Sequence, residues 1–393
     1  MNTTTTICSI DLKETGAVLT WSDGFSSFYH YVWLRDCCYC SSCGDGFSSN
    51  RFLHPSDVPL DVKPREFEQI TPTSLKIIWH QGDHESHYDV DWLRRHSYDD
   101  DSRKSRFREI KTWRAEISSC LPSVHYQDAC QTDSLRLSLY RHLLDFGFVV
   151  VRGGPDTENG IESAAGLIGE INDSAYGKFF DLSPKSKIKT AGNTMFPVPP
   201  HTDEAFRYDP PGINVLHCIR PANQGGESVL VDGFQLGERL RETAPDAFAL
   251  LAQQPQPYYR VARENGIDQR ARAPIFVLNE NNAIVGFRYH PRASAPFDVP
   301  SDLFPKVYAA NKSLCELMFD PKNQARFRLE NGDAVLFDNQ RVLHARAAFD
   351  DVERKLKICS VSRERFHEKF RLLAHKLGYV EESEQILTAG VAG

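Results

Sequence analysis

The sequence has no long apolar run and no block of basic residues, and these absences exclude several classes of protein. No apolar stretch approaches the roughly 18 residues that are needed to cross a bilayer. The first residues carry neither the basic segment nor the apolar core of a secretory signal peptide. The formal net charge is −7, without a basic cluster. We therefore expect no membrane partner, no nucleic-acid partner and a cytoplasmic location.

The length and the local patterns predict two domains. With 393 residues, of which 41% are hydrophobic, the chain can bury a large core. Residues 1–95 have the pattern of short strands and turns, whereas a charged stretch within residues 96–114 predicts a solvated linker or an exposed helix. Residues 115–393 alternate short Val-, Ile- and Phe-rich strands with helical segments, one of them at 235–253, and no internal repeat is apparent. We predict a mainly β fold with flanking helices, in which the second domain is a double-stranded β-helix (jelly roll).

Four of the ten cysteines crowd into residues 37–43. Thiols stay reduced in the cytoplasm, so this cluster indicates metal ligands before disulfides. The spacing C-x-C-x-x-C supplies three thiolates from one loop, and tetrahedral zinc needs a fourth ligand, for which the histidine-rich stretch at His80, His84 and His87 is the candidate. We predict a structural Cys3His zinc site in the N-terminal domain, with Cys37 as the thiol that is not a ligand. The alternative is a loop of reduced cysteines without a metal.

The triplet His201-Thr202-Asp203 carries the most chemical information in the chain. In an extended segment, residues i and i+2 point to the same side, so His201 and Asp203 can bind one ion. His344 lies 141 positions further on (344 − 203) and completes the set only if the fold returns it. Two imidazoles and one carboxylate occupy one face of an octahedral Fe(II). Three positions then stay open, two for a chelating co-substrate and one for O2.

Two further residues indicate that the co-substrate is 2-oxoglutarate. This molecule chelates iron through its keto-acid end, so its distal carboxylate needs a cation and a hydroxyl from the protein. Arg354 follows His344 by ten positions (354 − 344), and its planar guanidinium matches a carboxylate with two parallel hydrogen bonds. Ser228 is the candidate hydroxyl. The alternative is that Arg354 is a surface charge beside Glu353.

Together these motifs resemble the γ-butyrobetaine hydroxylase family of Fe(II)/2-oxoglutarate dioxygenases, over most of the chain. The most specific segments are Val32-Trp33-Leu34-Arg35-Asp36, His84 ahead of Asp91-Trp92-Leu93, His201-Thr202-Asp203, and Phe337-Asp338-Asn339. The resemblance implies zinc at Cys38, Cys40, Cys43 and His84, iron at His201, Asp203 and His344, and 2-oxoglutarate at Arg354. It also implies a homodimer and a small zwitterionic substrate that carries a trimethylammonium group at one end and an anion at the other.

The expected ammonium site departs from the family pattern. The family holds this group against aromatic faces, as cation–π attraction favours. Here Tyr176 matches, and Phe180 stands where a Trp is usual. Asn193 and Ser360 stand where tyrosines are usual, so the resemblance implies a thinner aromatic cage.

The expected anion site also departs from the family pattern, in which amide side chains bind a carboxylate. This chain has Thr190, beside Lys189, at one of these positions and Arg288 at the other. A guanidinium suits a group with three oxygens and up to two negative charges, such as a phosphonate. The chain therefore resembles most the branch that hydroxylates 2-(trimethylammonio)ethylphosphonate at the carbon beside phosphorus, with γ-butyrobetaine as the second candidate. The alternative is that Arg288 faces solvent or pairs with a nearby carboxylate.

Two hypotheses from other classes use the same residues. A jelly-roll isomerase or hydrolase with a non-redox metal at the triplet would not need Arg354 and would work without O2. A zinc-containing binding or sensor protein with a vestigial iron site would bind metal without releasing succinate. The three iron ligands together with Arg354 favour the oxygenase.

Overall fold

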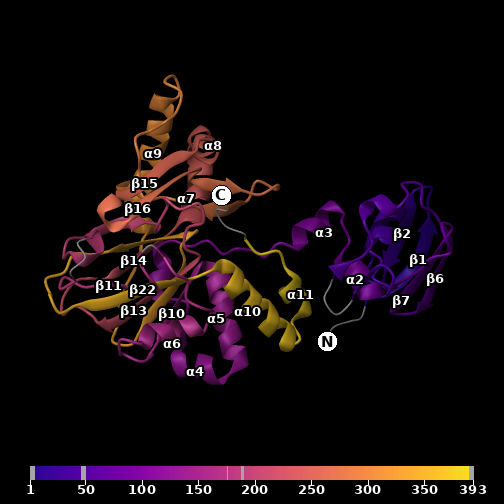
Figure 1. The fold of residues 1–393 in the computed structure, drawn as a ribbon, viewed down its shortest axis with the longest axis horizontal. Helices are drawn as coiled ribbons and strands as arrows, with labels where there is room; N and C mark the ends of the chain where they lie inside the picture. Colours follow the sequence, from indigo (N-terminus) through magenta and orange to yellow (C-terminus); the bar gives the residue numbers. More distant parts are fainter. Residues whose placement is uncertain (1–4, 46–49, 175, 187–189, 389–393) are drawn as a thin grey trace. The chain divides into compact units, whose positions relative to one another are not determined.

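The computed structural model describes residues 5–45, 50–174, 176–186 and 190–388, and the chain divides into two compact units, Met1–Phe107 and Arg108–Gly393 (Figure 1). The division falls inside the stretch 96–114 for which a linker was predicted. Part of that stretch forms the short helix α3 (Asp100–Ser105), which the Asp99 carboxylate caps by accepting a hydrogen bond from the Ser102 backbone. Within the described ranges no helix has both the length and the apolar character that a bilayer crossing requires.

The N-terminal unit contains the same arrangement twice, three antiparallel strands followed by a short helix. The first copy comprises β1 (Ile7–Leu12), β2 (Gly16–Trp21), β3 (Ser26–His30) and α1 (Tyr31–Asp36). The second comprises β6 (Pro64–Thr71), β7 (Ser74–Trp79), β8 (Glu85–Asp89) and α2 (Val90–Arg95). A minor hairpin, β4 (Gly44–Asp45) and β5 (Asn50–Arg51), lies between the two copies along the chain.

Equivalent side chains of the two copies make equivalent contacts. Tyr29 donates a hydrogen bond to the Leu93 carbonyl, and Tyr88, 59 positions later (88 − 29), donates one to the Leu34 carbonyl. Trp33 of α1 stacks on Trp92 of α2 at 5.8 Å between ring centroids. The expectation that the chain has no internal repeat is therefore wrong. Few positions preserve the repeat in the sequence, among them the tripeptides Trp33-Leu34-Arg35 and Trp92-Leu93-Arg94, while most other residues of the two copies differ.

The second unit is built on two packed sheets. One has six strands in the order β11-β22-β13-β20-β10-β9, and the other has four in the order β12-β21-β14-β19. Successive strands from β12 to β14 and from β19 to β22 alternate between the two sheets, which is the winding of a double-stranded β-helix. The predicted mainly β fold with flanking helices is confirmed. The strands are β9 (Ser123–His125), β10 (Phe148–Arg152), β11 (Phe180–Leu182), β12 (Val198–His201), β13 (Ile213–Arg220), β14 (Ser228–Asp232), β19 (Ala325–Phe327), β20 (Ala334–Asp338), β21 (Val342–Arg346) and β22 (Lys355–Val361).

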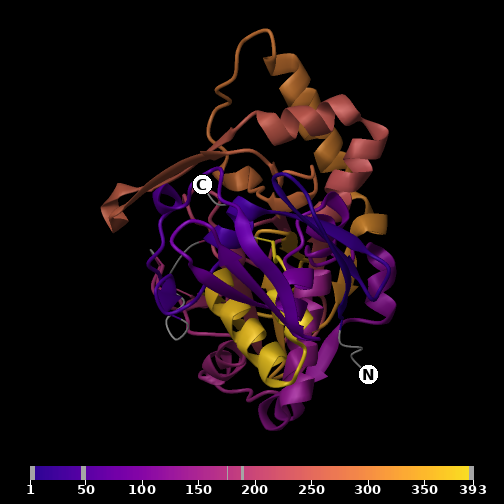
Figure 2. The same cartoon turned by 90° about the vertical axis from the view of Figure 1, so that its right-hand side faces the viewer.

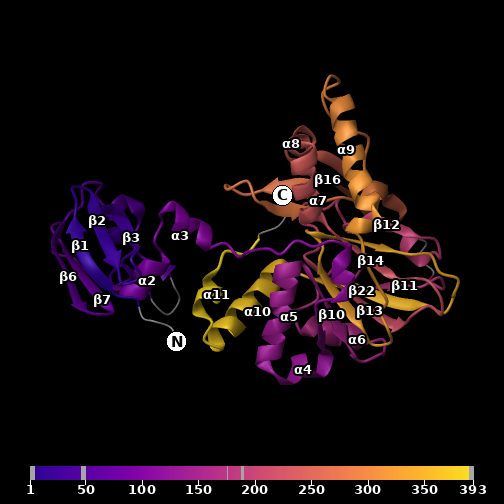
Figure 3. The ribbon, with the colours of Figure 1, turned by 180° about the vertical axis from the view of Figure 1, so that it is seen from behind.

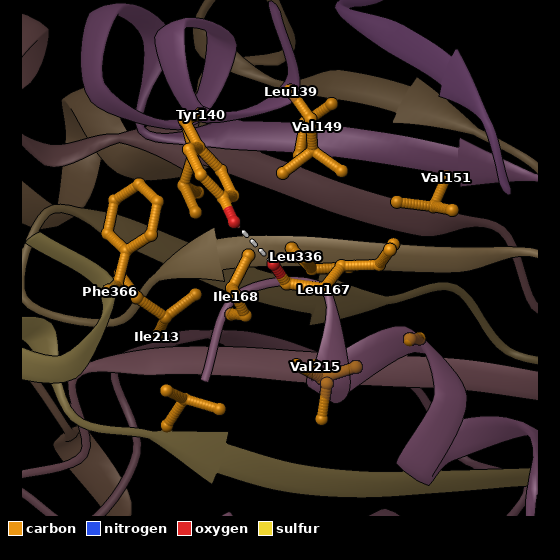
Figure 4. Close-up of a cluster of buried hydrophobic side chains, with 14 of the residues drawn as sticks. Leu139, Tyr140, Val149, Val151, Leu167, Ile168, Ile213, Val215, Leu336 and Phe366 are labelled. Atoms are coloured by element: carbon orange, nitrogen blue, oxygen red, sulfur yellow. Dashed lines mark hydrogen bonds between the residues drawn. The ribbon is translucent and has the colours of Figure 1, made fainter. Parts of the chain in front are cut away.

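Helices cover the outer face of the six-stranded sheet (Figure 4). Val149, Val215 and Leu336 point from three neighbouring strands toward these helices, where Tyr140 and Phe366 pack on them. The alternate residues of the same strands point to the other face and fill the space toward the four-stranded sheet. The covering helices are α4 (Tyr126–Gln131), α5 (Asp133–Phe146), α6 (Gly160–Gly166) and α10 (Arg363–Lys376), and α11 (Val380–Glu384) follows α10.

The chain between β14 and β19 forms an insertion with its own apolar core. Figures 1 and 3 show its helices grouped on one side of the sheets, and Figure 2 shows the β15–β16 hairpin projecting from it. The helix predicted at 235–253 is in fact two helices, because Pro245 has no N–H to donate and begins a new helix. The elements are α7 (Gly233–Thr243), α8 (Pro245–Gln253), β15 (Gln256–Ala262), β16 (Ile267–Ala273), β17 (Phe276–Leu278), β18 (Ile284–Phe287) and α9 (Phe304–Phe319).

Candidate metal centres and active site

The N-terminal unit brings together the four predicted zinc ligands. The Nε2 atom of His84 lies 3.4 Å from Sγ of Cys38, 3.6 Å from Sγ of Cys40 and 3.5 Å from Sγ of Cys43. Zn–S and Zn–N bonds of about 2.3 and 2.05 Å at the tetrahedral angle require a sulfur–nitrogen separation of about 3.6 Å. The donor set therefore fits a tetrahedral zinc ion without rearrangement.

The surroundings of this site act differently on its thiols. Arg35 directs Nη1 at the Cys43 sulfur, 3.4 Å away. Burial raises the pKa of Cys38 to about 11, whereas hydrogen bonds with Ser42 outweigh burial and lower the pKa of Cys40 to about 7. Burial lowers the pKa of His84, which keeps its imidazole neutral and able to ligate. Burial raises the pKa of Cys37 to about 11, and Cys37 is outside the ligand cluster, as predicted. The three thiols follow the first copy of the repeat and the histidine belongs to the β7–β8 turn of the second, so one ion would join the two copies.

The second unit brings together His201, Asp203 and His344. His201 ends β12 and faces His344 of β21 in the antiparallel register, and Asp203 follows two positions after His201. Asp203 lies 3.4 Å from Nε2 of His201 through Oδ1 and 3.5 Å from Nε2 of His344 through Oδ2. Adjacent ligands of an octahedral ion with bonds of about 2.1 Å are about 3 Å apart, so three such atoms can share one face of the ion. The side chains present therefore fit an iron ion.

Neighbouring polar groups hold these ligands in the orientation that metal binding needs. Nδ1 of His201 lies 2.9 Å from the Pro199 carbonyl, which places the proton on Nδ1 and leaves Nε2 as the ligand atom. The Asn214 amide donates to Oδ2 of Asp203 at 2.9 Å, and the Asp203 backbone N–H donates to the Asn339 side chain at 2.6 Å. Asn214 and Asn339 are both buried. Asn214 therefore orients the Asp203 carboxylate, and Asn339 holds the Asp203 backbone.

The electrostatics of the triplet favour the metal-binding protonation states. Burial alone would raise the pKa of Asp203, but the adjacent His344 and His201 outweigh burial and hold this pKa well below its usual range. Burial lowers the pKa of His344 to about 3. At neutral pH the site therefore presents one carboxylate and a neutral His344 imidazole, which is the set that a divalent ion prefers.

Arg354, the predicted partner of 2-oxoglutarate, is a buried cation without a counter-ion. Its side chain is only 4% exposed, and among the described residues no carboxylate forms an ion pair with it. Its guanidinium lies 4.8 Å from the centre of the Phe349 ring. A Cβ atom at Gly226, where φ is +72°, would approach its Nε to 3.1 Å, so glycine leaves room beside it. An unpaired buried guanidinium fits an anionic ligand such as the distal carboxylate.

Ser228 begins β14 and is buried. It lies opposite Arg346 in the antiparallel register of β14 and β21. Its predicted contact with the same carboxylate stays a prediction.

Two arginines that the sequence analysis did not single out also surround the triplet. Arg346 follows His344 by two positions on β21 and so points to the same face of the strand. The alternation of side chains along a strand could therefore have identified Arg346 from the sequence. Burial, together with the like charges of Arg354 and Arg292, lowers the pKa of Arg346 to about 10. Arg292 is an exposed residue, and it places Nη2 3.0 Å from Nε2 of His201.

The predicted ammonium-binding residues are partly brought together. Tyr176 and Phe180 form an edge-to-face pair with centroids 5.9 Å apart, and Arg260 donates to the Tyr176 hydroxyl. Asn193 is buried and accepts a hydrogen bond from the Ser183 backbone N–H. Thr190 lies at the start of a short 3-10 turn. Lys189 lies outside the described residues, and the substrate roles of all five remain predictions.

Arg288 has different partners from those expected. It is 1% exposed, and its Nη1 and Nη2 donate to the backbone carbonyls of Ala205, Arg207 and Tyr208. It neither faces solvent nor reaches a carboxylate through these bonds. The predicted role of Arg288 as the anion ligand stays a prediction. Its guanidinium fastens the segment after the metal triplet, because the carbonyls of that segment would otherwise lack buried donors.

Comparison with known proteins agrees with this geometry. Residues 106–360 match the family described as taurine catabolism dioxygenase TauD, TfdA family, and residues 10–94 match the N-terminal domain described as γ-butyrobetaine hydroxylase-like. The chain is 32% identical to a γ-butyrobetaine dioxygenase of Pseudomonas sp. strain AK-1, over 89% of this chain and 91% of that one. It is 28% identical to a trimethyllysine dioxygenase of Meyerozyma guilliermondii, over 90% and 92%. Among solved structures, a taurine dioxygenase from Burkholderia xenovorans matches 62% of this chain and 88% of that one, with 17% identity and a TM-score of 0.45.

Proposed function

Because this chain belongs to the TauD/TfdA family of dioxygenases, and within it to the γ-butyrobetaine hydroxylase-like enzymes, we propose that it hydroxylates a small trimethylammonium zwitterion. The enzyme is an Fe(II)/2-oxoglutarate-dependent dioxygenase. Its relatives act, by their names, on γ-butyrobetaine and trimethyllysine, and both compounds carry a trimethylammonium group. The relatives therefore support hydroxylation of a carbon chain that carries a trimethylammonium group.

One observation of the structure carries the reaction type. The His201, Asp203 and His344 side chains form one metal-binding face, and Arg354 lies in the same unit as a buried cation without a counter-ion. Iron and 2-oxoglutarate, when bound there, supply the oxidising chemistry. The protein's residues hold the metal on one face and position the co-substrate by its far carboxylate. They also leave open positions toward which a substrate C–H bond can be directed.

We propose 2-(trimethylammonio)ethylphosphonate as the substrate, with hydroxylation at the carbon beside phosphorus. What supports this choice is the charge around the triplet. Arg354 and Arg292 both lower the pKa of Arg346, and Asp203 is the only carboxylate among the described residues that influences the pKa of any of these three arginines. Iron, Asp203 and 2-oxoglutarate together carry one negative charge, which Arg354 neutralises. The two remaining guanidinium groups favour a dianion, and a phosphonate approaches that charge at neutral pH because its second pKa is close to 6.

The second candidate substrate is γ-butyrobetaine. The 32% identity to the Pseudomonas γ-butyrobetaine dioxygenase, over most of both chains, favours it. A carboxylate would neutralise only one of the two remaining guanidinium groups, and this difference separates the two candidates.

We also propose a homodimer, because the family resemblance implies one, and light scattering would test it.

Succinate release by the purified, Fe(II)-loaded enzyme tests the proposal. We expect more succinate per unit time with 2-(trimethylammonio)ethylphosphonate than with γ-butyrobetaine at equal concentrations, and no product without O2. The matched control omits the substrate and so measures uncoupled turnover. Faster release with γ-butyrobetaine would contradict the phosphonate assignment, and product formation without O2 would contradict the dioxygenase reaction itself.

A further inference from the structure

We propose that Arg292 is the residue that binds the anionic group of the substrate beside the iron. This inference rests on the proposed function, and it transfers to Arg292 the role that the sequence assigned to Arg288. Arg292 follows β18 in the insertion, outside the strands that carry the iron ligands. It would therefore contribute to specificity from an element outside the strands that carry the iron ligands.

The loop that carries Arg292 is joined to the metal triplet by four hydrogen bonds of Thr202. Thr202, the middle residue of the triplet, donates its backbone N–H to the Tyr289 carbonyl at 2.8 Å and accepts the Tyr289 N–H on its hydroxyl at 3.0 Å. The Thr202 carbonyl lies 2.8 Å from Nδ1 of His290. The ring of His290 in turn packs against that of His201 with centroids 4.8 Å apart. The position of the loop is thus set by the same segment that binds the metal.

The side chain of Arg292 ends at a metal-ligand atom. Its Nη2 lies 3.0 Å from Nε2 of His201, and this is its one hydrogen bond among the described residues. The lone pair of Nε2 cannot serve a guanidinium and a metal ion at the same time. Metal binding therefore releases the guanidinium from His201, and the short tether to Thr202 keeps it beside the metal, where it needs a new acceptor.

The other two candidate cations are committed elsewhere. Arg288 is buried and donates to three backbone carbonyls, as described above. Arg346 donates to the carbonyls of Gly192, Thr194 and Phe196. Arg292 has no comparable set of carbonyl acceptors among the described residues, and its exposure leaves it accessible to a molecule arriving from solvent.

The anion that Arg292 binds belongs to the substrate because the needs of 2-oxoglutarate are met by other groups. The keto-acid end of 2-oxoglutarate ligates the metal, and Arg354 is the cation for its distal carboxylate. A substrate whose anion lies on Arg292 has its adjacent carbon close to the metal, which is where hydroxylation beside phosphorus requires it.

Anaerobic calorimetric titration of the Mn(II)- and 2-oxoglutarate-loaded enzyme tests this assignment without any turnover. The variants are Arg292→Gln, Arg292→Lys and the matched control Arg239→Gln, which changes an exposed arginine of α7 that pairs with Glu242. For Arg292→Gln we expect the Kd of 2-(trimethylammonio)ethylphosphonate to rise about 10- to 100-fold, because a charge-assisted hydrogen bond is lost. The lysine variant should fall between the wild type and the glutamine variant, and the Arg239 variant should match the wild type.

The titration of the same variants with 2-oxoglutarate alone separates the two possible anions. The Kd of 2-oxoglutarate should change by no more than about twofold in Arg292→Gln, and the melting temperature should be unchanged. A weaker 2-oxoglutarate affinity with an unchanged phosphonate affinity would overturn the assignment in favour of the co-substrate. Equal affinities of wild type and Arg292→Gln for both compounds would overturn it altogether. If the wild type bound neither the phosphonate nor γ-butyrobetaine, the proposed function would fail, and this inference with it.

Discussion

Removing the charge of Arg354 should make the ligand-free enzyme more stable and at the same time abolish its response to 2-oxoglutarate. Most substitutions of a buried residue destabilise a protein. Arg354 is different because its guanidinium is buried without a carboxylate partner among the described residues. Burial lowers its pKa from 12.5 to about 10, which corresponds to roughly 3 kcal/mol of unfavourable free energy for the charged form.

The sign of this effect follows from the direction of the pKa shift. At neutral pH, Arg354 is charged in both the folded and the unfolded chain, so the folded state bears the whole cost of the buried charge. Raising the pH would relieve that cost only above about pH 10, where other groups titrate. Substitution by methionine, which has a similar length and no charge, removes the cost at neutral pH.

The assay is thermal unfolding of the Mn(II)-loaded protein with and without 2-oxoglutarate. For Arg354→Met without 2-oxoglutarate we expect a melting temperature about 2 to 6 °C above that of the wild type, the range that about 1 to 3 kcal/mol produces in a unit of this size. The Kd of 2-oxoglutarate should rise by about 30-fold or more, because a buried charge pair is lost. The stabilisation of the wild type by 2-oxoglutarate should therefore largely disappear.

The control variant is Arg239→Met, whose exposed ion pair should affect stability by about 0.5 kcal/mol or less. A lower melting temperature of Arg354→Met together with an unchanged affinity for 2-oxoglutarate would refute the reasoning. Arg354 would then be a packing residue and not the cation for the co-substrate.

Two further predictions concern the metal sites. Substituting Cys43 by serine should lower the zinc content, measured with a colorimetric chelator, and should lower the unfolding temperature of the N-terminal unit, because a zinc ion held by both copies of the repeat would stabilise that unit; a metal-free protein that melts at the same temperature as the zinc-loaded protein would contradict this. Because burial lowers the pKa of His344 to about 3, the His344 imidazole of the metal-free protein should stay neutral from pH 8 to pH 5, which NMR of its ring protons would measure; a titration of this imidazole near pH 6.5 would contradict the prediction.

The failures of the sequence analysis have identifiable causes. The duplicated arrangement in the N-terminal unit leaves only a short signature in the sequence, Trp33-Leu34-Arg35 and Trp92-Leu93-Arg94, and the matching hydrogen bonds of Tyr29 and Tyr88 establish the equivalence. The break at Pro245 was missed because the apolar pattern continues through it, although proline at a helix start is a recognisable signal. In both cases the local sequence contained the information, but in a form that composition and periodicity do not reveal.

The sequence by itself determined the chemistry of the two metal sites. His201 and Asp203 share a face because extended backbone has a period of two, and the spacing of Cys38, Cys40 and Cys43 places three thiols in one loop. Arg354 was identifiable because a guanidinium is the side chain best suited to a carboxylate. Local geometry and side-chain chemistry suffice for such inferences, since they do not depend on the rest of the fold.

Only the tertiary structure decided which partners each arginine contacts. Arg288 and Arg292 are four positions apart, and both have side chains long enough to reach several sites. Backbone carbonyls of the segment after the metal triplet take up the first, whereas the second ends at a ligand atom of His201. The reach of a long, flexible side chain is resolved only by the acceptors that the fold places around it, and those acceptors come from segments that lie far away in the sequence.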